Sequence, residues 1–110
     1  MPSRETAFDL IVTVVPKGRA QLVLETSLEA GARGGTILNA RGAGIHEHKK
    51  ILGIPVEPEK EVVLTLLPDH LTDHVLDAII HAVDLDKPGN GIAFVLDVKR
   101  VAGMRHGSEG

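Results

Sequence analysis

Cysteine, tryptophan and tyrosine are absent from this chain of 110 residues, and the only aromatic side chains are Phe8 and Phe94. Without cysteine there are no disulfides, no thiolate metal ligands and no cysteine nucleophile. With so few aromatics, a core must be packed from valine, leucine, isoleucine and alanine. Such a core suits a sheet covered by helices, and it favours further burial against copies of the same chain.

A basic surface and long apolar segments are missing as well. The formal net charge is −3, so the chain lacks the positive footprint of a nucleic-acid-binding protein. Residues 1–6 carry no long apolar run, and no later segment approaches the length of a membrane span. The default expectation is a cytoplasmic protein with no nucleic-acid partner.

Catalytic motifs are also lacking. Ser3, Ser27 and Ser108 stand in a terminus, a helix and a tail, without the sequence of a nucleophile elbow. The carboxylates are scattered, so no acid/base pair stands out. The sequence therefore predicts that the protein is not an enzyme.

What is present is an alternation of strand-like and helix-like segments. Runs rich in β-branched residues predict strands, and leucine-rich or amphipathic segments predict helices. In chain order these are a strand at 8–15, a helix at 19–32, strands at 36–41 and 61–67, a helix at 71–83 and a strand at 92–98. The order matches the ferredoxin-like βαββαβ sandwich, an α+β fold in which two helices cover one face of a four-stranded antiparallel sheet.

The length of the chain indicates how many domains it forms, and the uncovered face of the sheet indicates whether it forms an oligomer. At 110 residues with no internal repeat, the chain is predicted to be a single domain over 1–110, with a core at 7–107 and a C-terminal tail at 99–110. Two helices cover only one face. The other face leaves aliphatic side chains exposed unless it packs against neighbouring subunits, which predicts an oligomer.

A glycine-punctuated turn precedes the last strand. Gly89, Asn90 and Gly91 can adopt backbone angles that turn successive N–H groups toward one anion, and a phosphate would suit such a concavity. The alternative is an ordinary turn built from the usual turn residues.

Residues 44–59 form a long predicted loop, and loops of this length in compact domains are usually functional or disordered. Charged residues precede an apolar patch at 51–56. The patch is either a docking segment that orders on a partner protein or a segment that folds back onto the protein's own assembly.

The histidines allow two metal hypotheses. His46, Glu47 and His48 place three possible ligands side by side in the long loop, and a second set lies at helical spacing, comprising His70, His74, Asp77 and His81. Both spacings suit Zn²⁺ or Cu²⁺. The favoured interpretations are a surface or ligand-contacting role for the first set and a solvated helix face for the second.

Several glycine-rich motifs, taken in order, resemble the PII nitrogen-regulatory signal proteins over about residues 7–107. These motifs are Gly34-Gly35-Thr36, Arg41-Gly42-Ala43-Gly44, Pro68-Asp69 and the 89–98 segment, followed by Arg105. The resemblance implies a homotrimer that binds adenine nucleotides in clefts between subunits. It also implies that the 44–59 loop engages transporters, enzymes or regulators; with no tyrosine in the chain, the tyrosine modification known in part of the family cannot operate.

The same resemblance implies which residues contact the ligand. Gly89, Asn90 and Gly91 match the phosphate-binding loop, Lys60 matches the lysine at the base of the long loop, and Arg105 matches the second C-terminal arginine. Thr36, Gly42 and Gly44 match positions that line the cleft. His46 replaces the usual glutamine.

Two departures from the family pattern remove positive charge. Ile92 stands where the family has a lysine, and Gly103 stands where it has the first C-terminal arginine. Each lost charge-assisted contact is worth about 1.5–3 kcal/mol, so a smaller or less charged ligand such as ADP or AMP is expected in preference to ATP. The rival hypothesis is a metal-binding protein resembling the trimeric divalent-cation tolerance family, and an empty, vestigial cleft is a further alternative.

Overall fold

The computed structural model describes residues 7–44 and 49–103. Its helices and strands are, in chain order, β1 (Phe8–Pro16), α1 (Ala20–Glu29), β2 (Thr36–Arg41), β3 (Lys49–Ile51), β4 (Ile54–Val56), β5 (Glu59–Pro68), the 3₁₀ turn η1 (Asp69–Leu71), α2 (Thr72–Ala82) and β6 (Ile92–Val98). All six elements predicted from the sequence are present.

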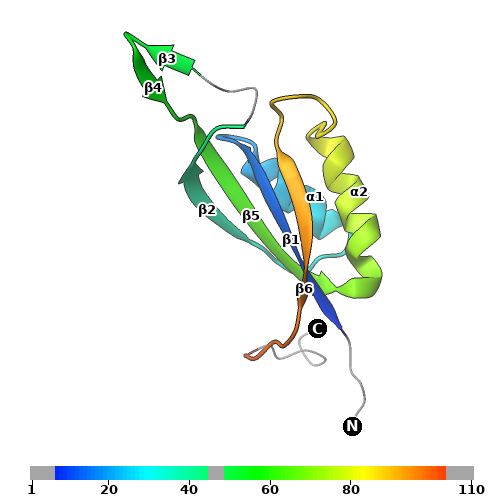
Figure 1. Cartoon of the computed structure of the whole chain (residues 1–110). Coiled ribbons are helices and arrows are strands. Elements are labelled where there is room, and N and C mark those ends of the chain that lie inside the picture. Colours follow the sequence, from blue (N-terminus) through cyan, green and yellow to red (C-terminus); the bar gives the residue numbers. More distant parts are fainter. Residues whose placement is uncertain (1–6, 45–48, 104–110) are drawn as a thin grey trace.

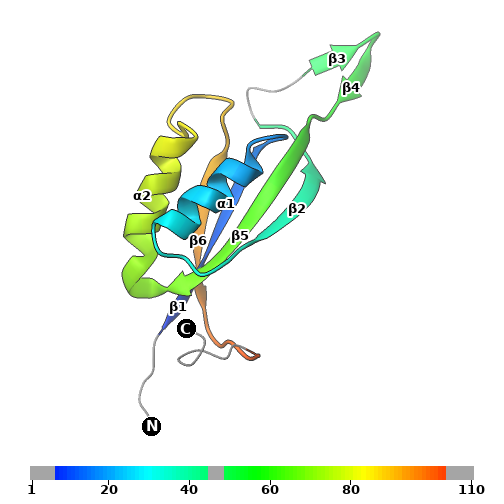
Figure 2. The same ribbon diagram turned by 180° about the vertical axis from the view of Figure 1, so that it is seen from behind.

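The main sheet has four antiparallel strands in the order β2-β5-β1-β6. Both helices lie on the same side of it, as the two opposite views in Figures 1 and 2 show. The predicted fold class, a ferredoxin-like sandwich with two helices on one face, is therefore confirmed.

The core lies between the helices and the two central strands, because alternate residues of a strand point to the same face. We call this helix-covered side the closed face. Its members are apolar and almost inaccessible to solvent: Ile11, Val15, Val63 and Leu67 from the sheet, with Ala20, Val23, Val75, Ile79 and Val83 packed over them.

Helix α1 is shorter than the predicted 19–32 segment, and its ends explain why. Arg19 provides no side-chain cap. Instead, the Glu61 carboxylate on β5 accepts hydrogen bonds from the N–H groups of Gly18 at 2.9 Å and Ala20 at 3.0 Å. At the other end Gly31 has φ +120°, and the Ala32 N–H donates to Ser27 O at 2.9 Å. This left-handed cap ends the helix at Glu29.

Helix α2 ends in a similar way without a glycine. Asp84 takes the left-handed position with φ 57°, and the Leu85 N–H donates to Ile80 O at 3.0 Å. The helix is thereby one residue shorter than predicted at this end, and η1 replaces its predicted beginning.

The prediction of a loop throughout 44–59 is wrong in part, because β3 and β4 pair as a hairpin within it. The two residues that connect them, Leu52 and Gly53, both have positive φ, at 53° and 80°. This is the mirror-image turn that matches strand twist, and it usually contains Asn-Gly or Asp-Gly, so Leu-Gly gives a weak sequence signal. The hairpin projects beyond the start of β5, away from the main sheet (Figure 1).

Candidate functional site

All four strands begin or finish at one end of the main sheet, which we call the sheet edge. Here β1 and β2 finish and β5 and β6 begin: Lys60 pairs with Pro16 on one side and with Ala40 on the other, and Ile92 pairs with Val14. The turn before β6 and the start of β5 are thus separated only by β1, which is about 10 Å for two strand spacings. The stem of the hairpin leaves from the same edge (Figure 2).

Two glycines shape the turn before β6, for different reasons. Gly91 has φ +129°, and a Cβ atom there would lie 2.4 Å from the carbonyl oxygen of Val14. Gly89 has φ +87°, but a Cβ atom there would meet nothing within 4 Å. Gly91 is therefore required by close packing on β1, whereas Gly89 is required only by its backbone angle.

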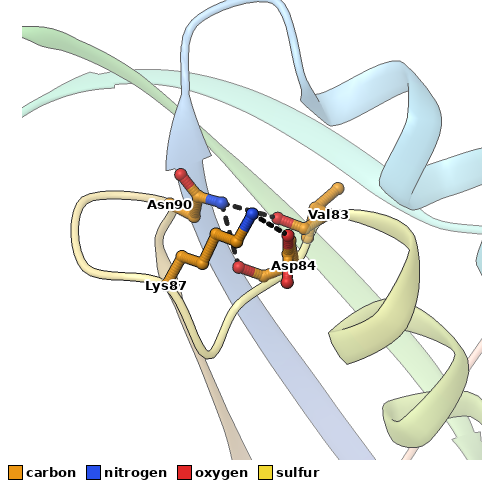
Figure 3. Close-up of polar contacts among 4 residues, drawn as sticks. All are labelled: Val83, Asp84, Lys87 and Asn90. Carbon is orange, nitrogen blue, oxygen red and sulfur yellow. Dashed lines mark hydrogen bonds and ion pairs between the residues drawn. The ribbon is translucent and has the colours of Figure 1, made fainter.

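Asn90 ties this turn to the end of α2 (Figure 3). Its Nδ2 donates to Asp84 O at 2.9 Å and to Val83 O at 3.3 Å, and its backbone N–H donates to Lys87 O at 3.2 Å. Lys87 Nζ lies 3.1 Å from Asp84 Oδ2. The Asn90 side chain thus orders the turn from within, and one of the three N–H groups in the predicted anion cradle already has an acceptor.

A hollow of about 440 Å³ opens at the same edge, between the ends of β1 and β2 and the start of β5. It is lined by Lys17, Asn39, Ala40, Arg41, Glu59 and Lys60. Three of these side chains are cationic and one is a carboxylate. Because Lys60 pairs with Ala40 and Glu59 pairs with Arg41, the side chain of Lys60 leaves the sheet on the face opposite to Arg41 and Glu59.

Lys60 is the least accessible charged group of this hollow, with only 8% of the residue exposed. Backbone hydrogen bonds hold the strands around it: Gly42 N–H donates to Pro58 O at 3.1 Å, and Lys17 N–H donates to Glu59 O at 3.3 Å. The base of the 44–59 segment is thus attached to both neighbouring strands.

Lys17 and Glu59 form an ion pair on the rim of the hollow, with Nζ and Oε1 2.8 Å apart. The hydrogen bond to Glu59 and then its negative charge raise the pKa of Lys17. The same hydrogen bond, followed by the positive charge of Lys17, lowers the pKa of Glu59. Both side chains are largely exposed, so solvent screens the pair.

The structure brings some of the predicted site residues together and leaves others apart. Gly42, Lys60 and the 89–91 turn share the sheet edge, and Gly44 lies just beyond Gly42 at the start of the long segment. Thr36 pairs with Leu64 at the far end of β2, about 13 Å along the strand from the partner of Lys60. His46 and Arg105 lie outside the described residues.

Of the six lining residues only Lys60 was a predicted site residue, and the charged ones that were missed are Lys17, Arg41 and Glu59. Each stands at or just beyond a strand end, and charge alone does not distinguish such a residue from any other surface group. The signal that would have found them is the strand order, which brings the end of β1, the end of β2 and the start of β5 side by side.

The structure bears on one of the two metal hypotheses. His70, His74, Asp77 and His81 are all exposed, and His81 Nδ1 lies 3.0 Å from Asp77 O. Within residues 7–44 and 49–103, no three histidine or carboxylate side chains gather closely enough to hold a metal ion. The His46, Glu47 and His48 set lies outside the described residues.

Comparison with known proteins identifies the class. Residues 8–108 match the model of the nitrogen regulatory protein P-II family. The chain therefore belongs to the P-II family of regulatory signal proteins, as the resemblance of its glycine motifs implied. No protein of curated function matches the chain. Among the helices of the described residues, none is both long and apolar enough to cross a membrane.

Proposed function

We propose that this protein is a cytoplasmic PII-type signal protein that binds an adenine nucleotide between the subunits of a homotrimer. Occupancy of the site alters the 44–59 segment, and that segment regulates a partner protein, such as a membrane transporter. The observation that carries the proposal is the meeting of the 89–91 turn, Lys60 and the stem of the hairpin at one sheet edge.

The uncovered face of the sheet supports assembly into an oligomer. We call it the open face. Phe94 and Leu96 on β6 are 44% and 47% exposed, beside Val12 and Leu10 of β1. Other apolar side chains of this face are Phe8, Val14, Leu38, Ala40, Val62, Leu64, Leu66, Ile92 and Val98. So large an apolar patch is costly to leave in water, and trimerisation as in the family would cover it.

The charges at the site favour a nucleotide with few phosphates. Ile92 and Gly103 supply no cation where the family pattern has a lysine and an arginine. Lys60, together with Arg105 from the tail, remains to bind phosphate. Because each missing contact is worth about 1.5–3 kcal/mol, ADP or AMP is expected to bind in preference to ATP.

The hairpin supports a docking role for the 44–59 segment. Leu52 at its tip is 95% exposed, and the hairpin extends away from the helices and the main sheet. An exposed apolar tip of this kind suits insertion into a partner. For the nucleotide to control docking, it must bind two arrangements of the segment with unequal affinity.

Calorimetric titration with ATP, ADP, AMP and a cyclic adenine nucleotide tests this function. We expect binding of at least one of them, and a loss of about 10- to 150-fold in Lys60→Gln and in Arg105→Gln, the equivalent of one charge-assisted contact each. Lys99→Gln, at the opposite end of β6, is the control and should bind as the unaltered protein does.

Absence of binding by every adenine nucleotide would refute the proposal. A second titration with Zn²⁺ or Cu²⁺, repeated on His46→Ala/His48→Ala, separates it from the metal-binding rival. Tight metal binding that disappears in the double variant, without nucleotide binding, would favour that rival.

A further inference from the structure

We propose that Asn90 is a positioning residue of the ligand site. Its side-chain amide fastens the turn before β6 to the end of α2, and this keeps the N–H groups of Gly89 and Gly91 available to a phosphate that Asn90 itself does not contact. The inference rests on the proposed function for the identity of the ligand, a phosphorylated nucleotide. The positioning itself concerns any small phosphate-bearing anion.

The Asn90 side chain acts as a cap for α2, from several residues further along the chain. The last carbonyl groups of a helix have no partner within the helix. Asn90 Nδ2 donates to Asp84 O at 2.9 Å and to Val83 O at 3.3 Å, two carbonyls that directly follow the last residue of α2, Ala82 (Figure 3). An amide nitrogen carries two hydrogens, which match these two acceptors. The side chain therefore has no donor left for a phosphate.

The backbone of the turn divides its donors in the same sense. The Asn90 N–H donates to Lys87 O at 3.2 Å. Within residues 7–44 and 49–103, no hydrogen bond uses the N–H of Gly89 or of Gly91. The predicted cradle of three N–H groups is thus a pair of open donors on either side of a residue that is turned inward. Backbone N–H groups of this kind suit the oxygen atoms of a phosphate.

Both ends of the turn are fixed in the absence of a ligand. At its beginning the Leu85 N–H donates to Ile80 O at 3.0 Å, and the Leu85 side chain packs against the core. At its end Gly91 lies so close to β1 that a Cβ atom there would be 2.4 Å from Val14 O. A site that is already ordered spends less of its binding free energy on ordering the protein.

The middle of the turn depends on the Asn90 amide. Gly89 has open space around it, since a Cβ atom there would meet nothing within 4 Å. The other brace is the ion pair between Lys87 and Asp84, whose side chains are 71% and 52% exposed. Solvent screens such a pair, so it adds little to stability. The amide is therefore the main contact that sets the position of Gly89.

This positioning matters more here than the family pattern suggests. Ile92 stands where that pattern has a lysine, so no fixed positive charge follows the turn. The attraction for a phosphate at this end of the site then comes from the two N–H groups. Uncharged donors of this kind attract an anion only when they are correctly placed, and Asn90 controls that placement.

The first test is a nuclear magnetic resonance titration of the unaltered protein with inorganic pyrophosphate and with ADP. We expect the backbone N–H signals of Gly89 and Gly91 to move downfield as they bond to phosphate oxygens. The backbone N–H and side-chain NH₂ signals of Asn90 should move less than half as far, because their acceptors do not change.

The second test compares variants by calorimetry with the same two probes. Asn90→Ala should weaken both probes at least fivefold. In the ligand-free variant the Leu85 N–H should exchange with solvent at least fivefold faster than in the unaltered protein, because the end of α2 has lost its cap.

Two control variants separate the amide from its surroundings. Asp84→Asn removes the ion pair but keeps the carbonyl group and a residue that tolerates the left-handed conformation, so it should not weaken either probe more than twofold. Gln21→Ala removes an exposed amide on α1 that donates to Glu25 at 3.2 Å, and it should leave both affinities within twofold.

The outcomes distinguish this inference from the proposed function. If ADP binds and Asn90→Ala behaves like the controls, the inference is overturned and the nucleotide function stands. If pyrophosphate produces the expected shifts and Asn90→Ala weakens it, while no adenine nucleotide binds, the nucleotide function fails and the inference stands.

Shifts of the Asn90 side-chain signals as large as those of the two glycines would show direct contact and overturn the positioning role. These shifts are measured on the unaltered protein, so they decide the question even if Asn90→Ala does not fold. Lack of binding by both probes would overturn both ideas.

Discussion

The closed and open faces of the sheet are both built from aliphatic residues, yet they differ sharply in burial. Ile11, Val15, Val63 and Leu67 on the closed face are fully buried under the helices, whereas Ile92 on the open face is 57% exposed. The same alternation along each strand produced both surfaces. The protomer's own stability therefore comes from the closed face, and the open face is available for association.

The largest expected effect comes from a cavity in the closed face. Leu67→Ala should lower the free energy of unfolding by about 2–5 kcal/mol, because Leu67 is completely buried and its neighbours cannot collapse fully into the space. Denaturant unfolding followed by circular dichroism measures this loss. A cost no greater than that of Leu96→Ala in the dissociated protomer would contradict the comparison.

A close second is Gly91, which contacts closed-face residues at the rim. Gly91→Ala would bring a Cβ atom to 2.4 Å from Val14 O and 3.2 Å from a Val15 methyl group, so we expect a loss of about 2–4 kcal/mol. Gly89→Ala is the matched control. With open space around it, only its positive φ matters and the loss should be about 1 kcal/mol. Equal losses in the same unfolding assay would show that packing on β1 is not what requires Gly91.

On the open face the expected change is in association. Leu96→Asp places a charge on an apolar patch that the proposed trimer buries, so the variant should sediment as a single chain. Its protomer should lose no more than about 1 kcal/mol, because the side chain is already half exposed. Analytical ultracentrifugation provides the mass; a single-chain mass for the unaltered protein at micromolar concentration would remove the proposed role of this face.

Two hydroxyls in the closed face should be dispensable. Thr13 and Thr65 are fully buried, and neither Oγ1 has a hydrogen-bond partner within the described parts of the chain. Thr13→Val and Thr65→Val keep the side-chain shape and remove an unsatisfied polar group, so each should stabilise the protomer by up to about 1 kcal/mol. A lower thermal midpoint in both variants would mean that these hydroxyls do bond within the native protein.

The smallest effect is expected at the exposed rim, from Lys17 and Glu59. The pKa of Glu59 is lowered in the folded state, so its contribution is present above the unfolded value and is lost as the pH falls through the folded one. The pKa of Lys17 is raised, so its contribution is complete below the unfolded value and is lost as the pH rises through the folded one.

Nuclear magnetic resonance titration of the Glu59 carboxyl carbon measures the first of these shifts. We expect a midpoint below the ordinary 4.5, returning toward it in Lys17→Gln. Thermal unfolding should scarcely change in that variant, because solvent screens an exposed pair. A marked fall in the thermal midpoint would mean that this exposed pair contributes as much to stability as the buried contacts of the closed face.

The strands and helices were predictable because each contains its own signal. The run of β-branched residues in β1 ends at Pro16, and the apolar residues of α2 recur at helical spacing. The residues at which the helices and strands end were harder to predict from the sequence. Helix α1 begins where Glu61, more than 40 positions away, accepts the Gly18 N–H, and no local pattern contains that partner.

The residues of the candidate site likewise divide into those predicted from the sequence and those found only in the structure. Gly89, Asn90, Gly91 and Lys60 were found because a family motif marks them, although the inward hydrogen bonds of Asn90 were not foreseen. Their roles in ligand binding stay predictions. Lys17 and Glu59 belong to no motif, and Arg41 begins a glycine motif without having been predicted as a site residue. The three were assigned to the hollow only because three strand ends meet around it.

By itself the sequence determined the identity and order of the elements, the apolar character of both sheet faces and the membership of the P-II family, since these depend on local periodicity and on short motifs. Only the tertiary structure decided which aliphatic residues are buried within the protomer, that a hairpin interrupts the long loop, and which charges share the hollow. Those features depend on strand register and on contacts between distant residues, and no window of neighbouring residues contains that information.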